Sequence, residues 1–348
     1  MTQQTTILTD FLAESANGLL IDVRSPEEYR RGHLPGAQNL PLFTDQERSE
    51  IGTLYVQNSR EEAIERGLEL VGPKMIFFIR SVKQMLAEGQ FAMDAKPPIC
   101  LYCWRGGMRS NSMGWLLRMY GFSVFVLEGG YKSYRAGLAQ LLQASSWKFR
   151  MLGGLTGCGK TDLLRQLTLR GKQVLDLEGL AEHRGSAFGH LGQSDQPSCE
   201  MFENRIHHCL RNFDPAQPVW VEAESQQIGR VHIPDVLFSK MQTAPLYLYE
   251  IPLAYRIRRL CQEYGHFEAE KLEMAFRKIE KRLGAERMRM AIGYVQNGRM
   301  DKAAEIALAY YDKSYSKSLA TQQNITIKKL IAETDDPERN VHYLLSEE

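Results

Sequence analysis

One short segment of the sequence, CWRGGMRS at residues 103–110, combines a nucleophile with groups that bind anions. Glycines let backbone N–H groups turn toward one point, and a helix that starts after such a loop favours a bound oxyanion. Arginines add positive charge, and these surroundings together favour the reactive thiolate form of a cysteine. The segment therefore predicts Cys103 as a catalytic thiol. The residues expected to support its anion loop are Arg105, Gly106, Gly107 and Arg109.

A second cysteine, Cys100, stands in C-x-x-C spacing with Cys103. This spacing also occurs in redox pairs and in halves of structural zinc sites. A zinc site needs a second pair of ligands at suitable spacing, and the sequence offers none. Cys100 lies within an apolar run, so we expect a buried strand residue. The six cysteines of the chain show no framework spacing, which predicts free thiols rather than disulfides.

A glycine-rich motif, G-x-x-x-x-G-K-T at residues 154–161, follows an expected strand and opens an expected helix. In this context backbone N–H groups cradle a diphosphate, a lysine neutralises it and a hydroxyl ligates Mg²⁺. The predicted diphosphate site consists of Gly154, Gly157, Gly159, Lys160 and Thr161, with Thr161 as the expected Mg²⁺ ligand. The acidic metal partner is expected at a later strand end. Its candidates are Asp176, Glu222 and Glu224, none of which forms an unambiguous Walker B motif.

The segment DLEGLAEHRGSAFG, residues 176–189, lies between two later expected strands. Its polar side chains stand beside glycines, so the backbone can approach a polar ligand closely. The candidate substrate-binding residues are Glu178, His183, Arg184 and Ser186. A solvated helix start followed by a turn explains the same pattern equally well.

The elements that must position these residues follow an α/β pattern. Apolar runs such as GLLIDVR and PPICLYCW alternate with helical periodicity over residues 44–89 and in RSNSMGWLLRMYG. This alternation predicts parallel sheets with helices on their faces, and it places Cys103 at the carboxyl end of a strand. In the second helical segment, a core-facing side is predicted for Met113, Leu116, Leu117 and Tyr120.

The composition limits the class and location of the protein. With 348 residues, 43% of them hydrophobic and 24% charged, the sequence predicts a folded chain of two or three domains. No apolar run approaches the roughly 20 residues of a spanning helix, and the N-terminus lacks the pattern of a signal peptide. We therefore expect a cytoplasmic enzyme without membrane contact. Its net charge of +1 means that any nucleic-acid surface must be a local patch.

Three segments, DVRSPEEYRRGHLPGA, CWRGGMRS and VFVLEGGY, resemble the N-terminal signature, active-site loop and closing strand of rhodanese domains. The resemblance implies that Cys103 carries a persulfide, or its selenium counterpart, between a donor and an acceptor. The spacing C-x5-R is one residue longer than in many sulfurtransferases and resembles that of phosphatases. A phosphatase or sulfurtransferase fused to a nucleotide-binding P-loop domain is therefore an alternative, and a noncatalytic scaffold is another.

The order of these motifs, followed by GLTGCGKT, DLEGLAEHRGSAFG and IEKRLGAERM, closely resembles the tRNA 2-selenouridine synthase family. The resemblance implies that sulfur is replaced by selenium in the wobble 2-thiouridine of tRNA, with selenophosphate as donor. It also implies geranylation of that sulfur from geranyl diphosphate. We then expect these two compounds as co-substrates, Mg²⁺ at the P-loop, no tightly bound cofactor, and a selenophosphate-supplying enzyme as a partner.

The two implied reactions suit the two predicted sites. A P-loop with Mg²⁺ stabilises a departing diphosphate, and an alkylated sulfur leaves a pyrimidine ring more readily than a thiocarbonyl sulfur. The loop of Cys103 can bind the phosphoryl end of selenophosphate. Cys103 then either takes selenium as a perselenide or attacks phosphorus, and the sequence does not choose between these roles.

A substrate as large as tRNA needs a basic surface, and the expected helices after Tyr255 carry several basic clusters. The first choice for tRNA binding is Arg277, Lys278, Lys281 and Arg282, which pair at spacing four and would share neighbouring helix faces. The alternative is a solvated helix face with ion pairs. The second choice for tRNA binding is Arg256, Arg258 and Arg259.

The expected organisation has three parts. Residues 1–140 form a rhodanese-like domain, residues 147–265 a P-loop domain that binds diphosphate, and residues 266–348 a helical region that contacts tRNA.

Overall fold

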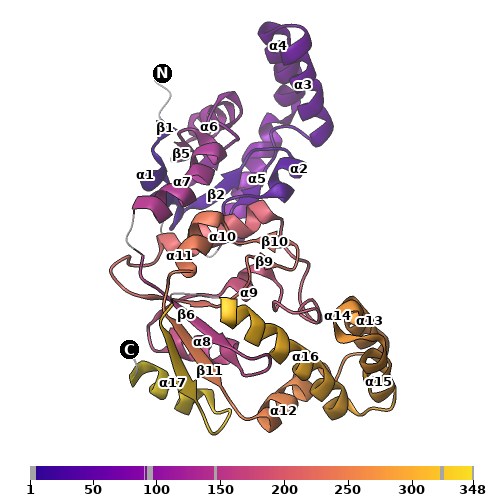
Figure 1. The fold of residues 1–348 in the computed structure, drawn as a ribbon. Coiled ribbons are helices and arrows are strands. Elements are labelled where there is room, and N and C mark those ends of the chain that lie inside the picture. The colour runs from indigo at the N-terminus through magenta and orange to yellow at the C-terminus, as the bar shows by residue number, and fades with distance from the viewer. Residues whose placement is uncertain (1–4, 90, 92–96, 145–146, 322–324, 347–348) are drawn as a thin grey trace. The chain divides into compact units, whose positions relative to one another are not determined.

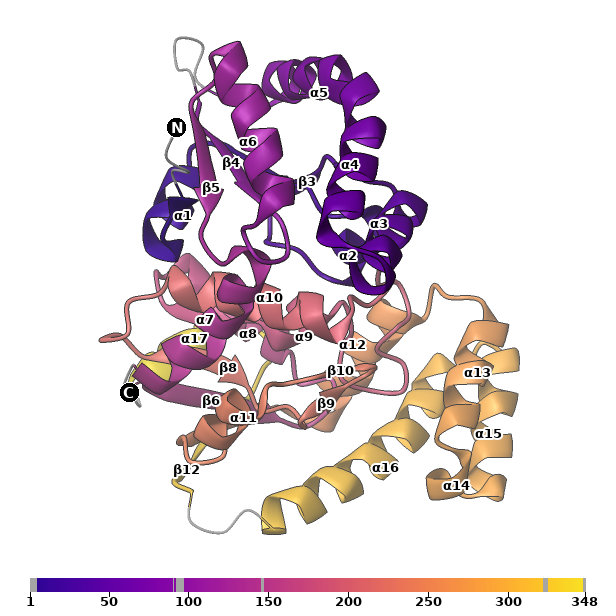
Figure 2. The ribbon, with the colours of Figure 1, turned by 90° about the horizontal axis from the view of Figure 1, so that it is seen from above.

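The computed structural model describes residues 5–89, 91, 97–144, 147–321 and 325–346. The chain divides into two compact units, residues 1–140 and 141–348 (Figure 1 and Figure 2). Each unit contains a five-stranded parallel sheet with helices, so the predicted α/β class is confirmed. Within the described ranges, no helix is long and apolar enough to cross a membrane.

The first unit is built on a sheet with the strand order β1-β5-β4-β2-β3. Its strands are β1 (Thr5–Thr6), β2 (Leu19–Asp22), β3 (Gln38–Asn39), β4 (Ile99–Tyr102) and β5 (Val124–Leu127). Its helices are α1 (Leu8–Ser15), α2 (Pro26–Arg31), α3 (Asp45–Gln57), α4 (Arg60–Val71), η1 (Gly72–Lys74), α5 (Met75–Glu88), α6 (Met108–Tyr120) and α7 (Gly130–Ala144). Because the buried strands β2 and β4 pair in parallel, the loops that follow them meet at one edge of the sheet.

The helix α6 buries the apolar side that its spacing predicts, with one exception. Met113, Leu116 and Leu117 lie in the core with the strands. Tyr120, which we expected beside them, is 50% exposed, and its ring contacts Phe122 instead. The prediction for Tyr120 is wrong because α6 ends at this residue and its ring packs on the turn that follows.

The second unit is built on a sheet with the strand order β12-β11-β6-β8-β7. Its strands are β6 (Phe149–Gly154), β7 (Gln173–Leu175), β8 (Val219–Glu222), β11 (Leu246–Glu250) and β12 (Ile327–Ile331). A separate hairpin consists of β9 (Gln227–Ile228) and β10 (Val231–His232). The helices near this sheet are α8 (Lys160–Leu169), α9 (Leu177–Ala181), α10 (Cys199–Arg211), α11 (Asp235–Met241), α12 (Leu253–Tyr264) and α17 (Pro337–Ser346). The central strand β6 leads directly into the glycine-rich motif.

A helical part is inserted between α12 and β12. Its helices are α13 (Ala269–Lys278), α14 (Glu280–Leu283), α15 (Ala285–Gln296) and α16 (Met300–Thr321). Figure 2 shows α13, α14 and α15 gathered beside one end of the long helix α16. The expected helical region 266–348 is therefore not helical throughout, because β12 pairs in parallel with β11 and α17 packs on α8. The strand is short and carries two lysines, so its pairing with β11 rather than its own pattern decides its structure.

Candidate active sites

The thiol of Cys103 lies at the start of a tight loop between β4 and α6. Cys103 directly follows the last strand residue and is 3% exposed. The hydroxyl of Ser110, in the first turn of α6, donates a hydrogen bond to the sulfur at 3.2 Å. Arg105 is exposed and has no hydrogen-bond or ion-pair partner in the described part of the chain. Its guanidinium is therefore free to bind an anionic ligand.

Two left-handed glycines fix the backbone of this loop. Gly106 (φ +63°) has no room for a side chain, because a Cβ there would collide with the carbonyl of Leu127. Gly130 (φ +60°) lies so close that a Cβ would collide with the carbonyl of Cys103. The N–H of Tyr131 donates to the same carbonyl at 2.8 Å. The turn at residues 128–131, which follows β5, thus holds the thiol loop in place.

Replacing Gly130 with alanine should displace the thiol loop. The added Cβ meets backbone atoms, and a left-handed conformation is strained for alanine. We expect the melting temperature to fall by roughly 5–10 °C and the loop amides to lose hydrogen-exchange protection. Gly36→Ala is the matched control, since Gly36 is also left-handed (φ +84°) but has nothing within 4 Å of its Cβ position. Equal effects of the two substitutions would contradict the predicted collision.

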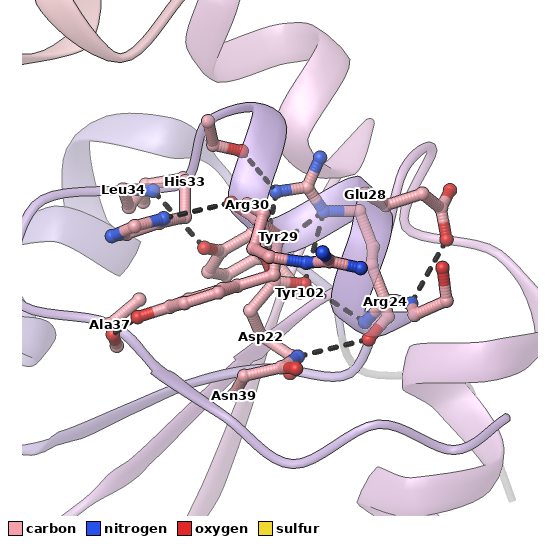
Figure 3. A network of polar contacts seen from close by, with 12 residues as sticks. Asp22, Arg24, Glu28, Tyr29, Arg30, His33, Leu34, Ala37, Asn39 and Tyr102 are labelled. Atoms are coloured by element: carbon pink, nitrogen blue, oxygen red, sulfur yellow. Dashed lines mark hydrogen bonds and ion pairs between the residues drawn. The ribbon is translucent and has the colours of Figure 1, made fainter. Parts of the chain in front are cut away.

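A buried ion pair supports the strand ends beside the loop (Figure 3). Asp22 ends β2 next to Tyr102, and its carboxylate lies 2.6 Å from the guanidinium of Arg24. Arg24 also donates to the carbonyl of Gly32 at 2.6 Å and lies 3.9 Å from the ring centre of Tyr131. The DVR segment therefore has a structural role, and its charges are paired within the first unit.

Arg109, expected at the anion loop, has a partner of its own. Its guanidinium forms two hydrogen bonds to the carboxylate of Glu28, at 2.5 and 3.1 Å. Burial alone would raise the pKa of Glu28, but the hydrogen bonds and charge of Arg109 outweigh it and lower that pKa. Glu28 also accepts the N–H of Ser25 and so completes the cap of α2. Arg109 thus ties the start of α6 to α2, whereas Arg105 stays available.

Cys100 lies on the other face of β4. It packs with Tyr102 and Phe11, whereas Cys103 packs with Leu101 and Ile21 in a different core cluster. Burial raises the pKa of Cys100 to about 12, and both cysteines are free thiols. Side chains on opposite faces of a sheet do not reach each other, which argues against a redox pair. The described residues also hold no cluster of three or more metal-ligating side chains.

In the second unit, the glycine-rich motif forms the loop between β6 and α8. Gly157 (φ +77°) and Gly159 (φ +85°) adopt the left-handed conformation that glycine favours. Lys160 begins α8, and its amine donates to the carbonyl of Gly154 at 3.3 Å. The N–H of Gly154 in turn donates to the hydroxyl of Tyr315 at 2.9 Å. The loop has the strand-to-helix setting expected of a P-loop.

The P-loop opens onto a cavity of about 1200 Å³, which is larger than most small-molecule sites. Lys160 and Thr161 line it together with Glu178 and Glu224. Burial, with the nearby charge of Glu224, raises the pKa of Glu178 to about 8. Burial alone would lower the pKa of Lys160, but Cys158, Glu178 and Glu224 raise it overall. The charged amine of Lys160 suits the binding of a polyanion. The nearby carboxyl groups, whose pKa values are raised, suit the transfer of a proton.

Side chains with oxygen atoms line the same cavity, although no three acidic side chains of the described residues are grouped as a metal site. The hydroxyl of Thr161 and the carboxyl groups of Glu178 and Glu224 line it. Glu222, at the end of β8, accepts the N–H of Glu178 at 3.1 Å, and its buried Oε1 has no hydrogen-bond partner among the described residues. The carboxylate of Asp176 caps α9 by accepting the N–H of Gly179. Hydroxyl and carboxylate oxygens are the ligands that Mg²⁺ prefers beside phosphate oxygens, so Thr161 and Glu224 have the donor types that fit the ion.

The structure brings three of the four candidate substrate-binding residues together at this cavity. Glu178, Arg184 and Ser186 line it, and Arg184 is ion-paired with Glu263. His183 is not in the wall. It is 9% exposed, and burial, together with His190 and Lys278, lowers its pKa. We therefore interpret His183 as a packing residue.

Two cavity residues come from α16, far from the P-loop in sequence. Tyr315 contacts Gly154, and the hydroxyl of Tyr311 accepts the N–H of Ala187 at 3.2 Å. Nothing in the sequence predicts that these two tyrosines lie at the diphosphate site. These tyrosines join the helical part to the cavity wall.

The second-choice arginines for tRNA binding have other partners. Arg256 is buried, donates to the carbonyl of Thr156 at 2.8 Å and pairs with Asp312 at 2.6 Å. Arg259 pairs with Asp162 in the first turn of α8 and lines the cavity. Arg258 pairs with Asp335. Arg256 and Arg259 thus brace the P-loop, and tRNA binding by these arginines stays a prediction.

The first-choice basic residues for tRNA binding are exposed, but they do not lie on one helix. Those residues are Arg277, Lys278, Lys281 and Arg282. α13 ends at Lys278 and α14 begins at Glu280, so spacing four does not place them on shared helix faces as predicted. None of the four forms an ion pair within the ranges that the structure describes, although the amine of Lys278 lies 3.4 Å from His190. Their charge is therefore available to a polyanion.

Two family models match the chain. Residues 8–137 match the rhodanese-like domain, and residues 147–336 match the tRNA 2-selenouridine synthase AAA domain. Each matched range falls within one of the two compact units.

The chain is also similar to named relatives over most of its length. It is 34% identical over 331 residues to the tRNA 2-selenouridine synthase of Psychromonas ingrahamii, which covers 86% of this chain and 87% of that relative. It is 38% identical to the protein of the same name from Cupriavidus necator, with 72% and 68% covered. For that of Pseudomonas putida, the identity is 35% with 91% and 86% covered. With both of its units matched, the chain belongs to the tRNA 2-selenouridine synthase family.

Proposed function

We propose that this chain is a transferase that replaces sulfur by selenium in the wobble 2-thiouridine of tRNA, in two steps at two sites. The observation that carries the proposal is the presence in one chain of two different sites. One is a thiol loop with a free arginine, and the other is a P-loop cavity with acidic walls. The names of the relatives supply the product. If the chain were a phosphatase or a sulfurtransferase, the P-loop cavity would have no role in the reaction at Cys103.

The first proposed step is alkylation of the thiocarbonyl sulfur by geranyl diphosphate in the P-loop cavity. The sulfur forms a bond to C1 of the geranyl group while the C1–O bond breaks, and the electron pair of that bond leaves with diphosphate. Lys160 and the loop amides stabilise the charge on the departing group. The proton of N3 on the base passes to the ionised form of Glu178, which the raised pKa makes a stronger base than an ordinary carboxylate.

Thr161 and Glu224 would hold Mg²⁺ in this cavity, with phosphate oxygens as further ligands. The ion neutralises negative charge on the diphosphate when it is bound. Lys160 orients the same diphosphate from the loop side, and Arg259 holds the first turn of α8 through Asp162. We propose no tightly bound organic cofactor.

The second proposed step uses selenophosphate at Cys103. Selenium attacks C2 of the alkylated base, and the sulfur leaves with the geranyl group as a thiolate that takes up a proton. The thiolate of Cys103 then attacks phosphorus, the P–Se bond breaks with its electron pair on selenium, and N3 takes up a proton, so the base keeps selenium as a C=Se group. Water hydrolyses the phosphorylated cysteine. Arg105 binds the phosphoryl oxygens, and a separate enzyme supplies selenophosphate. We place the reaction in the cytoplasm, where tRNA is available.

The two-step route is tested by adding the co-substrates one at a time to the full chain with 2-thiouridine tRNA and Mg²⁺. Geranyl diphosphate alone should give S-geranyl-2-thiouridine, and later addition of selenophosphate should convert it to 2-selenouridine. Both nucleosides are measured by mass spectrometry. Formation of 2-selenouridine at an equal rate without geranyl diphosphate would overturn the route.

Reversing two exposed charges, Arg277→Glu with Lys281→Glu, should weaken tRNA binding and flatten its salt dependence. Each lost phosphate contact should reduce the log-log slope of affinity against salt by about 0.7–0.9. Geranyl diphosphate binding should be unchanged, because the P-loop is a different segment. The measurement is a set of tRNA binding isotherms at several salt concentrations.

The control for this prediction reverses two exposed charges on α5, Arg80→Glu with Lys83→Glu. The control changes the net charge equally but leaves the basic cluster near α13 and α14 intact. An equal loss in both double variants would mean that net charge, and not this cluster, attracts tRNA.

A further inference from the structure

A second, smaller cavity lies inside the helical part of the second unit. Its volume is about 70 Å³, and residues of α12, α13, α15 and α16 line it. Much of its lining is apolar and well buried, with Phe188, Leu272, Phe276, Val295 and Ala307 each at most 8% exposed. Its lining among the described residues includes no charged side chain. Water in such a recess would find few partners, so an apolar ligand is the favoured occupant.

The small cavity adjoins the P-loop cavity, and we call the wall that the two share the mouth of the recess. The residues that line both cavities are Thr156, Ser186, Leu260, Tyr264 and Tyr311. Thr156 belongs to the P-loop itself. An organic group esterified to a diphosphate in the P-loop therefore has an apolar recess within reach.

We infer that this recess binds the distal isoprene unit of an isoprenyl diphosphate and sets the chain length that the P-loop site accepts. The inference rests on the proposed function, in which the P-loop holds geranyl diphosphate. In the transfer, the C1–O bond breaks and the C1–S bond forms, while the distal carbons take no part in the chemistry. Their burial therefore selects among donors without changing the reacting atoms.

The rings at the shared mouth suit the reacting end of such a chain. Tyr264 and Tyr311 line the mouth, and burial raises the pKa of each to about 12, so both stay neutral phenols. Aromatic faces stabilise the positive charge that develops on an allylic carbon as its bond to oxygen breaks.

The volume of the recess sets the expected limit on length. A water-sized group needs about 10–15 Å³ of such volume, so 70 Å³ holds about five heavy atoms, the size of one isoprene unit. A geranyl chain places its distal unit in the recess and its proximal unit at the mouth. A farnesyl chain would need room for another five carbons, roughly the whole recess again. We expect use of geranyl and dimethylallyl diphosphate and little use of farnesyl diphosphate.

The test fills the recess from α16. Ala307→Leu adds three carbons to the apolar wall, and Ala309→Leu adds the same carbons on the exposed side of the same helix. Alkylation of 2-thiouridine tRNA is measured with dimethylallyl, geranyl and farnesyl diphosphate. For Ala307→Leu, kcat/KM with geranyl diphosphate should fall at least about tenfold, and with dimethylallyl diphosphate less than about threefold. Ala309→Leu should match the unmodified chain.

A second measurement needs no catalysis. Cys261 lines the recess, whereas Cys199 is exposed and lies outside both cavities. In the unmodified chain, geranyl diphosphate should slow maleimide labelling of Cys261, and inorganic diphosphate should not. Labelling of Cys199, followed on its own peptide by mass spectrometry, should be equal under all conditions.

The outcomes separate this inference from the proposed function. If Ala307→Leu keeps the geranyl-to-dimethylallyl ratio of Ala309→Leu, the chain binds elsewhere and the inference is wrong. If the unmodified chain binds inorganic diphosphate but alkylates tRNA with none of the three donors, the proposed function fails and the inference fails with it. If Ala307→Leu does not fold, the labelling of Cys261 decides, and equal labelling with geranyl and inorganic diphosphate overturns the inference.

Discussion

Cys103→Ala is expected to abolish selenium incorporation into tRNA while both units stay folded. The substitution removes the nucleophile but keeps the backbone hydrogen bond from Tyr131 that holds the loop. We expect 2-selenouridine to fall at least about a thousandfold, as for the loss of other catalytic nucleophiles. S-geranyl-2-thiouridine should accumulate, because the P-loop site is unchanged. Mass spectrometry of tRNA nucleosides from a strain that carries only the variant measures both.

The matched control for this prediction is Cys100→Ala, which removes the other thiol of the C-x-x-C spacing. Cys100 faces the opposite core, and its raised pKa of about 12 keeps it protonated. The control should therefore retain selenium incorporation. Normal 2-selenouridine in the Cys103→Ala strain would show that the thiol loop is not the selenium site.

Lys160→Ala and Thr161→Ala are expected to impair alkylation of 2-thiouridine tRNA by about 10²–10³-fold. Each substitution removes a group that lines the cavity proposed to hold the departing diphosphate, and the loss of one such group typically costs this much. Selenation of tRNA that is supplied already alkylated should be spared, since diphosphate does not leave in that step. The two reactions are followed separately by mass spectrometry of the nucleosides.

Lys148→Ala serves as the control, because Lys148 is exposed and directly precedes β6, at the opposite end of that strand from the P-loop. It removes the same charge as Lys160→Ala without touching the cavity. Normal alkylation by both P-loop variants would mean that diphosphate binds at another site.

The sites that the sequence predicts best are those whose chemistry lies in consecutive residues. The P-loop needs glycines at fixed positions before a lysine, and Gly157 and Gly159 adopt the left-handed conformation that this spacing requires. The thiol loop is similar, because strand, nucleophile and helix follow each other within residues 99–120. In both cases consecutive residues form the loop itself, so the sequence pattern is sufficient to predict it, although the turn at residues 128–131 also holds the thiol loop.

The cavity walls could not be predicted in this way, because distant segments build them. Tyr315 contacts a residue 161 positions earlier, and Arg256 donates to a carbonyl 100 positions earlier. Nothing local to either residue indicates these contacts. The sequence also does not predict the interruption of the helix at Ile279, because the residues around it are all compatible with a continuous helix.

The position of β12 has a consequence for the order in which the chain is made. β11 lies between β6 and β12, yet β12 comes from residues 327–331, after the whole helical insertion. During synthesis, the side of β11 that pairs with β12 therefore stays open until residues 327–331 have left the ribosome. A nascent chain that stalls within α16 exposes that edge to other chains, which makes it prone to aggregate. The stage most in need of a chaperone is thus the one at which the helical insertion has been made but β12 has not.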